Sequence, residues 1–123
     1  MKLEVTLLGA AQIAGEARER LIDARLSTTS PAARPLPVRG TVSVEGLARE
    51  AEAEGELHEG RLTLALAGEQ RGHLRLDLHP EAASMLVGEV TWGSVRAPAL
   101  LRIDLRSEAT RFVRSLVRRG RGA

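Results

Sequence analysis

The chain has 123 residues, no cysteine, one Trp, one Phe and no Tyr. This length suits one domain that can bury a core without disulfides, so we expect a single domain over residues 1–123. The missing thiols exclude disulfides and cysteine-based metal sites. The near absence of aromatic side chains argues against nucleic-acid modules that stack bases on aromatic platforms. No window is apolar enough for a spanning helix, and the N-terminus is a poor signal peptide, so the expected location is cytoplasmic.

Charge is unevenly distributed along the chain, although the net charge is only +2. Between Glu45 and Glu59 six glutamates face a single arginine, whereas from Arg102 to Ala123 seven arginines face two acids. An acidic middle and a basic end can pair within one chain or between subunits. Self-association is therefore one expectation.

The first part of the chain predicts a strand followed by a helix. Residues 2–8 alternate apolar and polar side chains, which is typical of a half-buried strand. Over residues 10–26 alanine and leucine recur at helical spacing, which predicts an N-terminal helix. Gly15 weakens this helix by about 1 kcal/mol relative to Ala. The competing interpretation is a continued strand pair with Leu21, Asp23, Arg25 and Ser27 on one face.

The next segments predict a connector and two strands. Residues 27–37 hold three of the five prolines and predict a Pro-rich connector. Residues 38–47 return to alternation, with a turn at Gly46. Residues 50–58 alternate Glu with small residues, so a helix and a strand compete. We favour the strand because the segment is short and lies between strands.

A β-hairpin over residues 61–79 is the clearest feature of the sequence. Leucines occupy every second position in both arms, and glycines bracket a short polar turn. Residues 81–92 predict a helical turn that continues as a strand, and residues 95–106 predict a further strand. Residues 107–119 predict a basic amphipathic helix, followed by a frayed tail at 120–123.

These elements together predict a mainly β, α+β fold. We expect about six or seven strands in an antiparallel meander, forming a curled sheet or a small barrel. The C-terminal helix and an N-terminal helix complete this expectation.

Histidine and acidic side chains are the candidates for metal or catalytic chemistry. One interpretation is a metal site, or a small enzyme, that uses a His/Asp cluster on one strand face and its neighbour. The candidate ligands are His58, His73, Asp77 and His79. Arg75 interrupts this face and no compact ligand motif occurs, so a solvated strand face is the favoured interpretation. No nucleophile motif or phosphate loop is present, so the sequence favours a protein without catalysis or cofactor.

The predicted C-terminal helix is the favoured partner-binding element. Its basic face suits an acidic protein surface or lipid headgroups. The candidate contacts are Arg111, Phe112, Arg114, Arg118 and Arg119. The favoured function is a non-enzymatic binding or assembly module for a protein partner or an apolar ligand held in the barrel. Peripheral membrane binding by the helix is an alternative, and nucleic acid is disfavoured.

The order of segments also carries a resemblance. GTVSVEG, an acidic strand, the hairpin and LLRIDLRSEATRFVRSL follow one another over residues 38–117. This order resembles the small β-domains that accompany some bacterial sterol- or lipid-related flavin oxidoreductases. The resemblance implies a curled sheet and an auxiliary role, and it carries no site residue with it.

Overall fold

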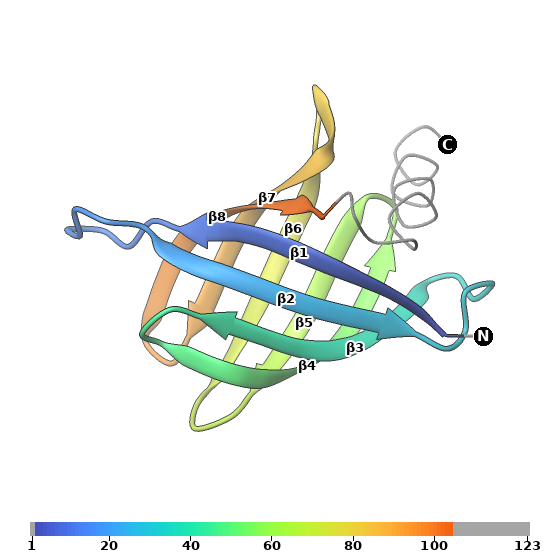
Figure 1. The fold of residues 1–123 in the computed structure, drawn as a ribbon, viewed down its shortest axis with the longest axis horizontal. Helices are drawn as coiled ribbons and strands as arrows, with labels where there is room; N and C mark the ends of the chain where they lie inside the picture. The colour runs from blue at the N-terminus through green and yellow to red at the C-terminus, as the bar shows by residue number, and fades with distance from the viewer. Residues whose placement is uncertain (1, 105–123) are drawn as a thin grey trace.

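The computed structural model describes residues 2–104, which form eight β-strands joined by loops. The strands are β1 (Leu3–Ala11), β2 (Arg20–Thr28), β3 (Leu36–Val44), β4 (Ala48–His58), β5 (Arg61–Ala67), β6 (Arg71–His79), β7 (Ala82–Trp92) and β8 (Val95–Ile103). Each strand pairs antiparallel with the next, and β8 pairs with β1, so the sheet closes into a barrel (Figure 1). A closed sheet leaves no edge along which another chain could add a strand.

Alternation of side chains divides the strands between the barrel interior and its outer surface, and β4 interrupts it with a bulge between inward Ala48 and Ala51. On β5, for example, Leu62, Leu64 and Leu66 are buried while Arg61 and Ala65 are exposed. The interior is almost wholly aliphatic, and Thr28 is the one buried polar residue among those described. The largest fully buried side chains are Leu7, Leu36, Val42, Val44, Leu64, Leu66, Leu74, Leu76, Val90, Leu101 and Ile103. An eight-stranded barrel has an interior just wide enough for such side chains to fill.

Five glycines at inward positions allow the strands to coil tightly around this core. A Cβ atom at any of them would collide with a backbone carbonyl oxygen of the neighbouring strand. They are Gly9, Gly40, Gly55, Gly72 and Gly88. Glycines at such positions are the usual device for bending a sheet closed.

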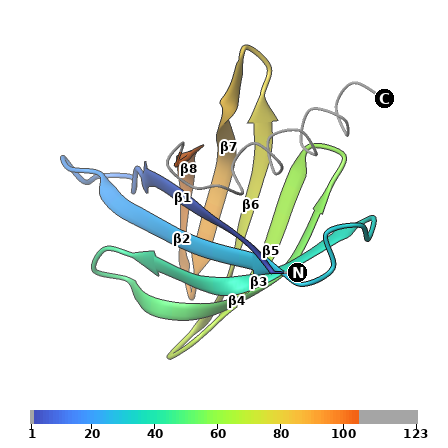
Figure 2. The same cartoon turned by 45° about the vertical axis from the view of Figure 1, so that its right-hand side comes forward.

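The two ends of the barrel differ in how they are finished. β1 begins and β2 ends at one end of the barrel, which we call the first end. The expected Pro-rich connector, residues 27–37, is only partly a loop, because β2 continues to Thr28 and β3 begins at Leu36. At the other end lies the loop of residues 12–19 between β1 and β2. Figure 2 shows the hairpin of β6 and β7 extending past its neighbours at the first end.

The α+β assignment is wrong, because the described residues form an all-β closed barrel without a helix. Residues 10–26, predicted as a helix, form the end of β1, a loop and most of β2. The competing strand interpretation is correct there: Ile22, Ala24 and Leu26 point inward and pair with β1 and β3. Pairing on both sides outweighs the local helical spacing of the alanines. The predicted C-terminal helix, 107–119, lies outside the described residues.

Several expectations along the middle of the chain are confirmed. The hairpin of residues 61–79 forms β5 and β6, with leucines facing one another inside the barrel. The segment around 50–58 is a strand, with Ala51, Ala53 and Leu57 buried.

Two details differ from the expectation. Residues 82–92 form a strand from the first residue, and the helical turn expected there does not occur. The sheet has eight strands, more than the six or seven expected, because residues 20–28 contribute one.

Candidate binding surface

A row of four apolar side chains crosses the outer surface of β7, β8, β1 and β2. Val87 lies opposite Leu100, Leu100 opposite Ala10, and Ala10 opposite Leu21 in the register of the barrel. Because the pairs are direct cross-strand neighbours, the four side chains lie side by side. We call these residues, Val87, Leu100, Ala10 and Leu21, the apolar row.

The apolar row contains both of the large hydrophobic side chains that are exposed within residues 2–104. Leu21 has 63% of its surface exposed and Leu100 has 42%. An open groove of about 720 Å³ runs along the row, with Leu8, Met85 and Pro98 among its lining residues. Single exposed leucines are ordinary on protein surfaces, but exposed apolar residues that are contiguous make a surface a candidate for binding.

Charged side chains flank the apolar row on the side toward the first end of the barrel. In the next cross-strand row Arg102 lies opposite Leu8, and Leu8 lies opposite Asp23. Arg102 makes no ion pair with any residue from 2 to 104. The Oδ2 atom of Asp23 lies 3.6 Å from Nη2 of Arg25, whereas its Oδ1 atom is shielded from solvent and accepts no hydrogen bond from a described residue. The flank therefore holds a cation and a carboxylate oxygen, each with unused bonding capacity.

The opposite half of the barrel carries the contrasting surface. There a charged row crosses β3 to β6 through successive register pairs, and its members are Arg39, Glu54, Ala65 and His73. Arg39 pairs with Glu54 at 3.2 Å, and nearby Arg61 pairs with Asp77 at 2.8 Å. This surface therefore carries two ion pairs, and Ala65 is the one apolar member of the charged row.

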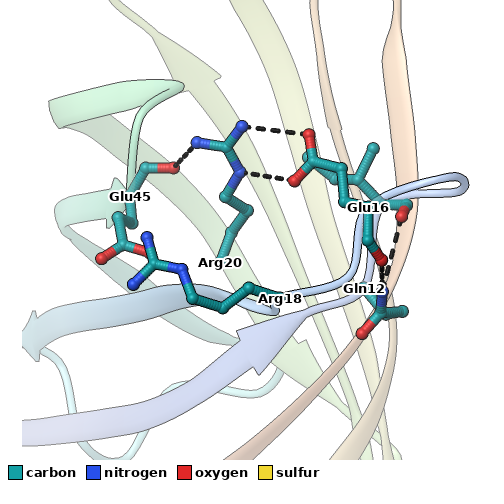
Figure 3. A network of polar contacts seen from close by, with 6 residues as sticks. Gln12, Glu16, Arg18, Arg20 and Glu45 are labelled. Atoms are coloured by element: carbon teal, nitrogen blue, oxygen red, sulfur yellow. Dashed lines mark hydrogen bonds and ion pairs between the residues drawn. The ribbon is translucent and has the colours of Figure 1, made fainter.

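A polar network links the loop of residues 12–19 to β2 and to Glu45 (Figure 3). The Arg20 guanidinium donates to both carboxylate oxygens of Glu16, at 2.8 and 3.0 Å, and to the main-chain oxygen of Glu45 at 3.3 Å. Arg18 pairs with the Glu45 carboxylate at 3.1 Å, and the Gln12 amide donates to the main-chain oxygen of Glu16. The hydrogen bond from Arg20 holds the pKa of Glu16 below its usual value, and Glu16 in turn raises the pKa of Arg20. This network fixes the loop between β1 and β2.

The barrel interior is a weaker candidate for binding. A small apolar space lies at the first end, between Val5, Leu26 and Leu36, and has a volume of about 30 Å³. That is roughly the share of one water molecule in the liquid, whereas an apolar cavity that binds benzene measures about 150 Å³. A wider space of about 430 Å³ opens at the other end, with both Glu45 and Trp92 in its lining. An apolar ligand inside the barrel, one of the two partners expected from the sequence, stays a prediction.

The structure does not bring the predicted histidine and aspartate side chains together. His73, Asp77 and His79 follow one another along β6, where Asp77 is bound by Arg61 and Nδ1 of His79 accepts from the main chain of Glu81. His58 lies at the end of β4, with its Nε2 atom 3.8 Å from Glu59. Within residues 2–104 no three potential ligands are placed to hold a metal ion. Nor does this part of the chain contain a helix long and apolar enough to cross a membrane.

The partner-binding residues expected in the C-terminal helix all lie outside the described residues. They are Arg111, Phe112, Arg114, Arg118 and Arg119. Their role stays a prediction.

The apolar row was not anticipated from the sequence, although a signal for it exists. The four strands of the row carry adjacent large apolar residues, as in Leu7-Leu8, Leu21-Ile22, Leu86-Val87 and Leu100-Leu101. Strands β3 to β6 carry no such pair. In each pair one residue enters the core and the other points outward, so the doublets mark strands that are apolar on both faces.

Comparison with protein-family models, with curated proteins and with solved structures finds no match.

Proposed function

We propose that the protein is a non-enzymatic binding module that engages a protein partner through the apolar row. The observation that supports this most directly is that Leu21 and Leu100, both exposed, stand in one register line with Ala10 and Val87. Burial of such a patch removes apolar surface from water at about 25 cal/mol per Å². A charged rim around an apolar centre is the usual anatomy of a protein interface.

The shape of the surface favours a protein over a small ligand. Small-molecule sites are concave and enclose most of their ligand, whereas the groove along the row is open and lies on the outside of a convex barrel. The interior is packed with aliphatic side chains. A partner with a broad, complementary apolar face can cover the row, and a small apolar molecule there would stay largely in water.

The accessory role that the resemblance implies fits a binding module of this kind and stays a prediction. The alternatives weighed on the sequence find less support. The histidines are dispersed, and the basic helix of the membrane-binding alternative lies outside the described residues.

Site-specific photo-crosslinking in producing cells tests the proposal. A benzoyl-phenylalanine side chain is introduced at Leu21 in one variant and at Ala65 in another, and adducts are compared after irradiation. Ala65 is the matched control, because it is an exposed outward residue at mid-strand in the charged row. We expect a discrete protein adduct from position 21 that is lost when Ala10→Asp is added to the same chain.

The proposal is wrong if position 21 yields no adduct, or yields the same adducts as position 65. It is also wrong if Ala10→Asp leaves the adduct unchanged while the variant unfolds at the wild-type temperature. An adduct with another copy of the chain and one with a different protein both support the proposal.

A further inference from the structure

We infer that the protein partner is a second copy of this chain, packed row against row about a two-fold axis that runs along the strands. The inference rests on the proposed function, because it takes the apolar row as the docking surface. It adds the identity of the occupant and the orientation in which it binds.

A two-fold axis in the plane of contact can bring two identical rows together in two ways. If the axis runs along the row, every residue meets its own copy. If the axis runs along the strands, the row of one copy meets the row of the other copy in the opposite order; we call this the reversed arrangement, and the first the self-facing arrangement. Leu100 then lies opposite Ala10 of the second copy, and Leu21 lies opposite Val87 of the second copy.

The side-chain sizes favour the axis along the strands. The two central positions of the row, on β8 and β1, are a large exposed leucine and an alanine. In the reversed arrangement each Leu100 projects onto the small Ala10 of the other copy, so the two surfaces interdigitate. In the self-facing arrangement the two Leu100 side chains collide at the centre and leave a gap between the two alanines, which loses packing.

The charges on the flank favour the same axis. In the reversed arrangement Arg102 lies opposite Leu8 of the second copy, one strand away from Asp23 of that copy. One strand spacing is about 4.8 Å, within the reach of an arginine side chain. Two symmetry-related ion pairs then form between Arg102, which has no ion pair within residues 2–104 of one copy, and the exposed part of the Asp23 carboxylate, whose Oδ2 atom already lies 3.6 Å from Nη2 of Arg25.

The opposite flank brings together two acids in the reversed arrangement, but one of them is already neutralised. Glu19, just before β2, faces Glu89 of the second copy, and Arg96 pairs with Glu89 at 3.0 Å. The self-facing arrangement instead places Glu19 opposite Asp23 of the second copy. The charge pattern as a whole therefore suits the reversed arrangement.

Cysteine cross-linking tests both the occupant and the orientation, and the chain has no native cysteine to interfere. Leu21→Cys and Val87→Cys are made as two separate proteins and treated with a short bis-maleimide, alone and mixed. The reversed arrangement places residue 21 opposite residue 87 of the other copy. It separates the two copies of residue 21 by three strand spacings, about 14 Å. We expect a covalent dimer from the mixture, and little from either protein alone.

Sedimentation velocity of the wild type over a range of concentrations accompanies the cross-linking. If Leu21→Cys alone gives a covalent dimer, and the mixture gives no additional cross-link between positions 21 and 87, the orientation is overturned while the proposed function stands. A monomer at every concentration overturns the second copy as partner, and the in-cell adduct at position 21 then decides whether another protein takes its place. Loss of both the dimer and the adduct removes the proposed function itself.

Discussion

The apolar row and the charged row each consist of four outward side chains in register, on opposite halves of one barrel. Both stand on strands whose inward faces contribute to the same aliphatic core. They differ only in what points outward: Leu21 and Leu100 on one half, Arg39 paired with Glu54 on the other. The core is built from the inward side chains of both halves, whereas Leu21 and Leu100 stay exposed outside it. The difference separates what specifies the fold from what is available for binding.

The largest expected effect tests whether the two halves share one core. Leu74→Ala on β6, behind the charged row, and Leu101→Ala on β8, behind the apolar row, each remove a fully buried side chain. Each should lower the free energy of unfolding by about 2–5 kcal/mol, since lost burial and the remaining cavity add together. Urea unfolding measures both. A large loss at one position and almost none at the other would mean that the halves are not packed on one core.

The inward glycines give the second comparison between the halves. Gly9→Ala on β1 and Gly55→Ala on β4 each place a methyl group against a backbone oxygen of the next strand. Overpacking of this kind costs about 1–3 kcal/mol, and we expect similar losses on both halves in thermal unfolding. Gly15→Ala is the control for a glycine in open space, although its positive φ of 85° adds strain of its own.

The third prediction separates binding from stability. Ala10→Asp and Ala65→Asp introduce the same charge at corresponding outward positions of the two rows. Both should change the free energy of unfolding only slightly, as surface substitutions do. Only Ala10→Asp should weaken self-association, by at least about tenfold in the dissociation constant, which corresponds to roughly 1.4 kcal/mol. Equal effects on association at both positions would show that the apolar row is not the contact.

The fourth prediction concerns the flank of the row. Arg102→Asp places an acid next to Asp23 of the second copy and should weaken association several-fold through like-charge repulsion. Adding Asp23→Arg to the same chain reverses both charges and should restore association, as measured by sedimentation equilibrium at low salt. Failure of the double variant to recover, with its fold intact, would exclude this ion pair.

Much of the barrel could be predicted from alternation alone. The leucines of β5 and β6 and the small residues of β4 identify their inward faces without further information. Residues 10–26 could not be assigned, because alanine spacing suits a helix as well as a strand. The pairing of β2 with β3 favours a strand over a helix, and this pairing cannot be inferred from residues 10–26 alone. Closure of β8 onto β1 is equally non-local.

The candidate surface was harder to predict than the fold, for a related reason. Outward Leu21 lies beside inward Ile22, and outward Leu100 lies beside inward Leu101. Such doublets read as a break in alternation within one strand. Their meaning appears only when the barrel register places Leu21, Leu100 and Val87 in one line with Ala10. The arginines favoured on the sequence fall outside the described residues, so they stay a prediction.

The smallest expected effect separates the apolar row from the loop beside it. Because Arg20 lowers the pKa of Glu16 in the folded protein, this ion pair stabilises the fold above the unfolded pKa of about 4.3. Its contribution is lost as the pH falls through the lower, folded pKa. The stability difference between the wild type and Glu16→Gln should therefore be full at pH 7, shrink as the pH falls below about 4.3, and vanish below the lower, folded pKa of Glu16.

Thermal unfolding from pH 7 to pH 3 measures this difference. A double-mutant cycle with Arg20→Gln isolates the interaction energy between Glu16 and Arg20. This contribution to stability, which is lost in acid, comes from the loop of residues 12–19. The loop borders the groove through Gln12 and Glu19. If the apolar row is held by its strands alone, Glu16→Gln leaves the dissociation constant of the dimer unchanged at pH 7. A weaker dimer in Glu16→Gln would instead make the loop part of the contact and extend the contact surface beyond the four strands.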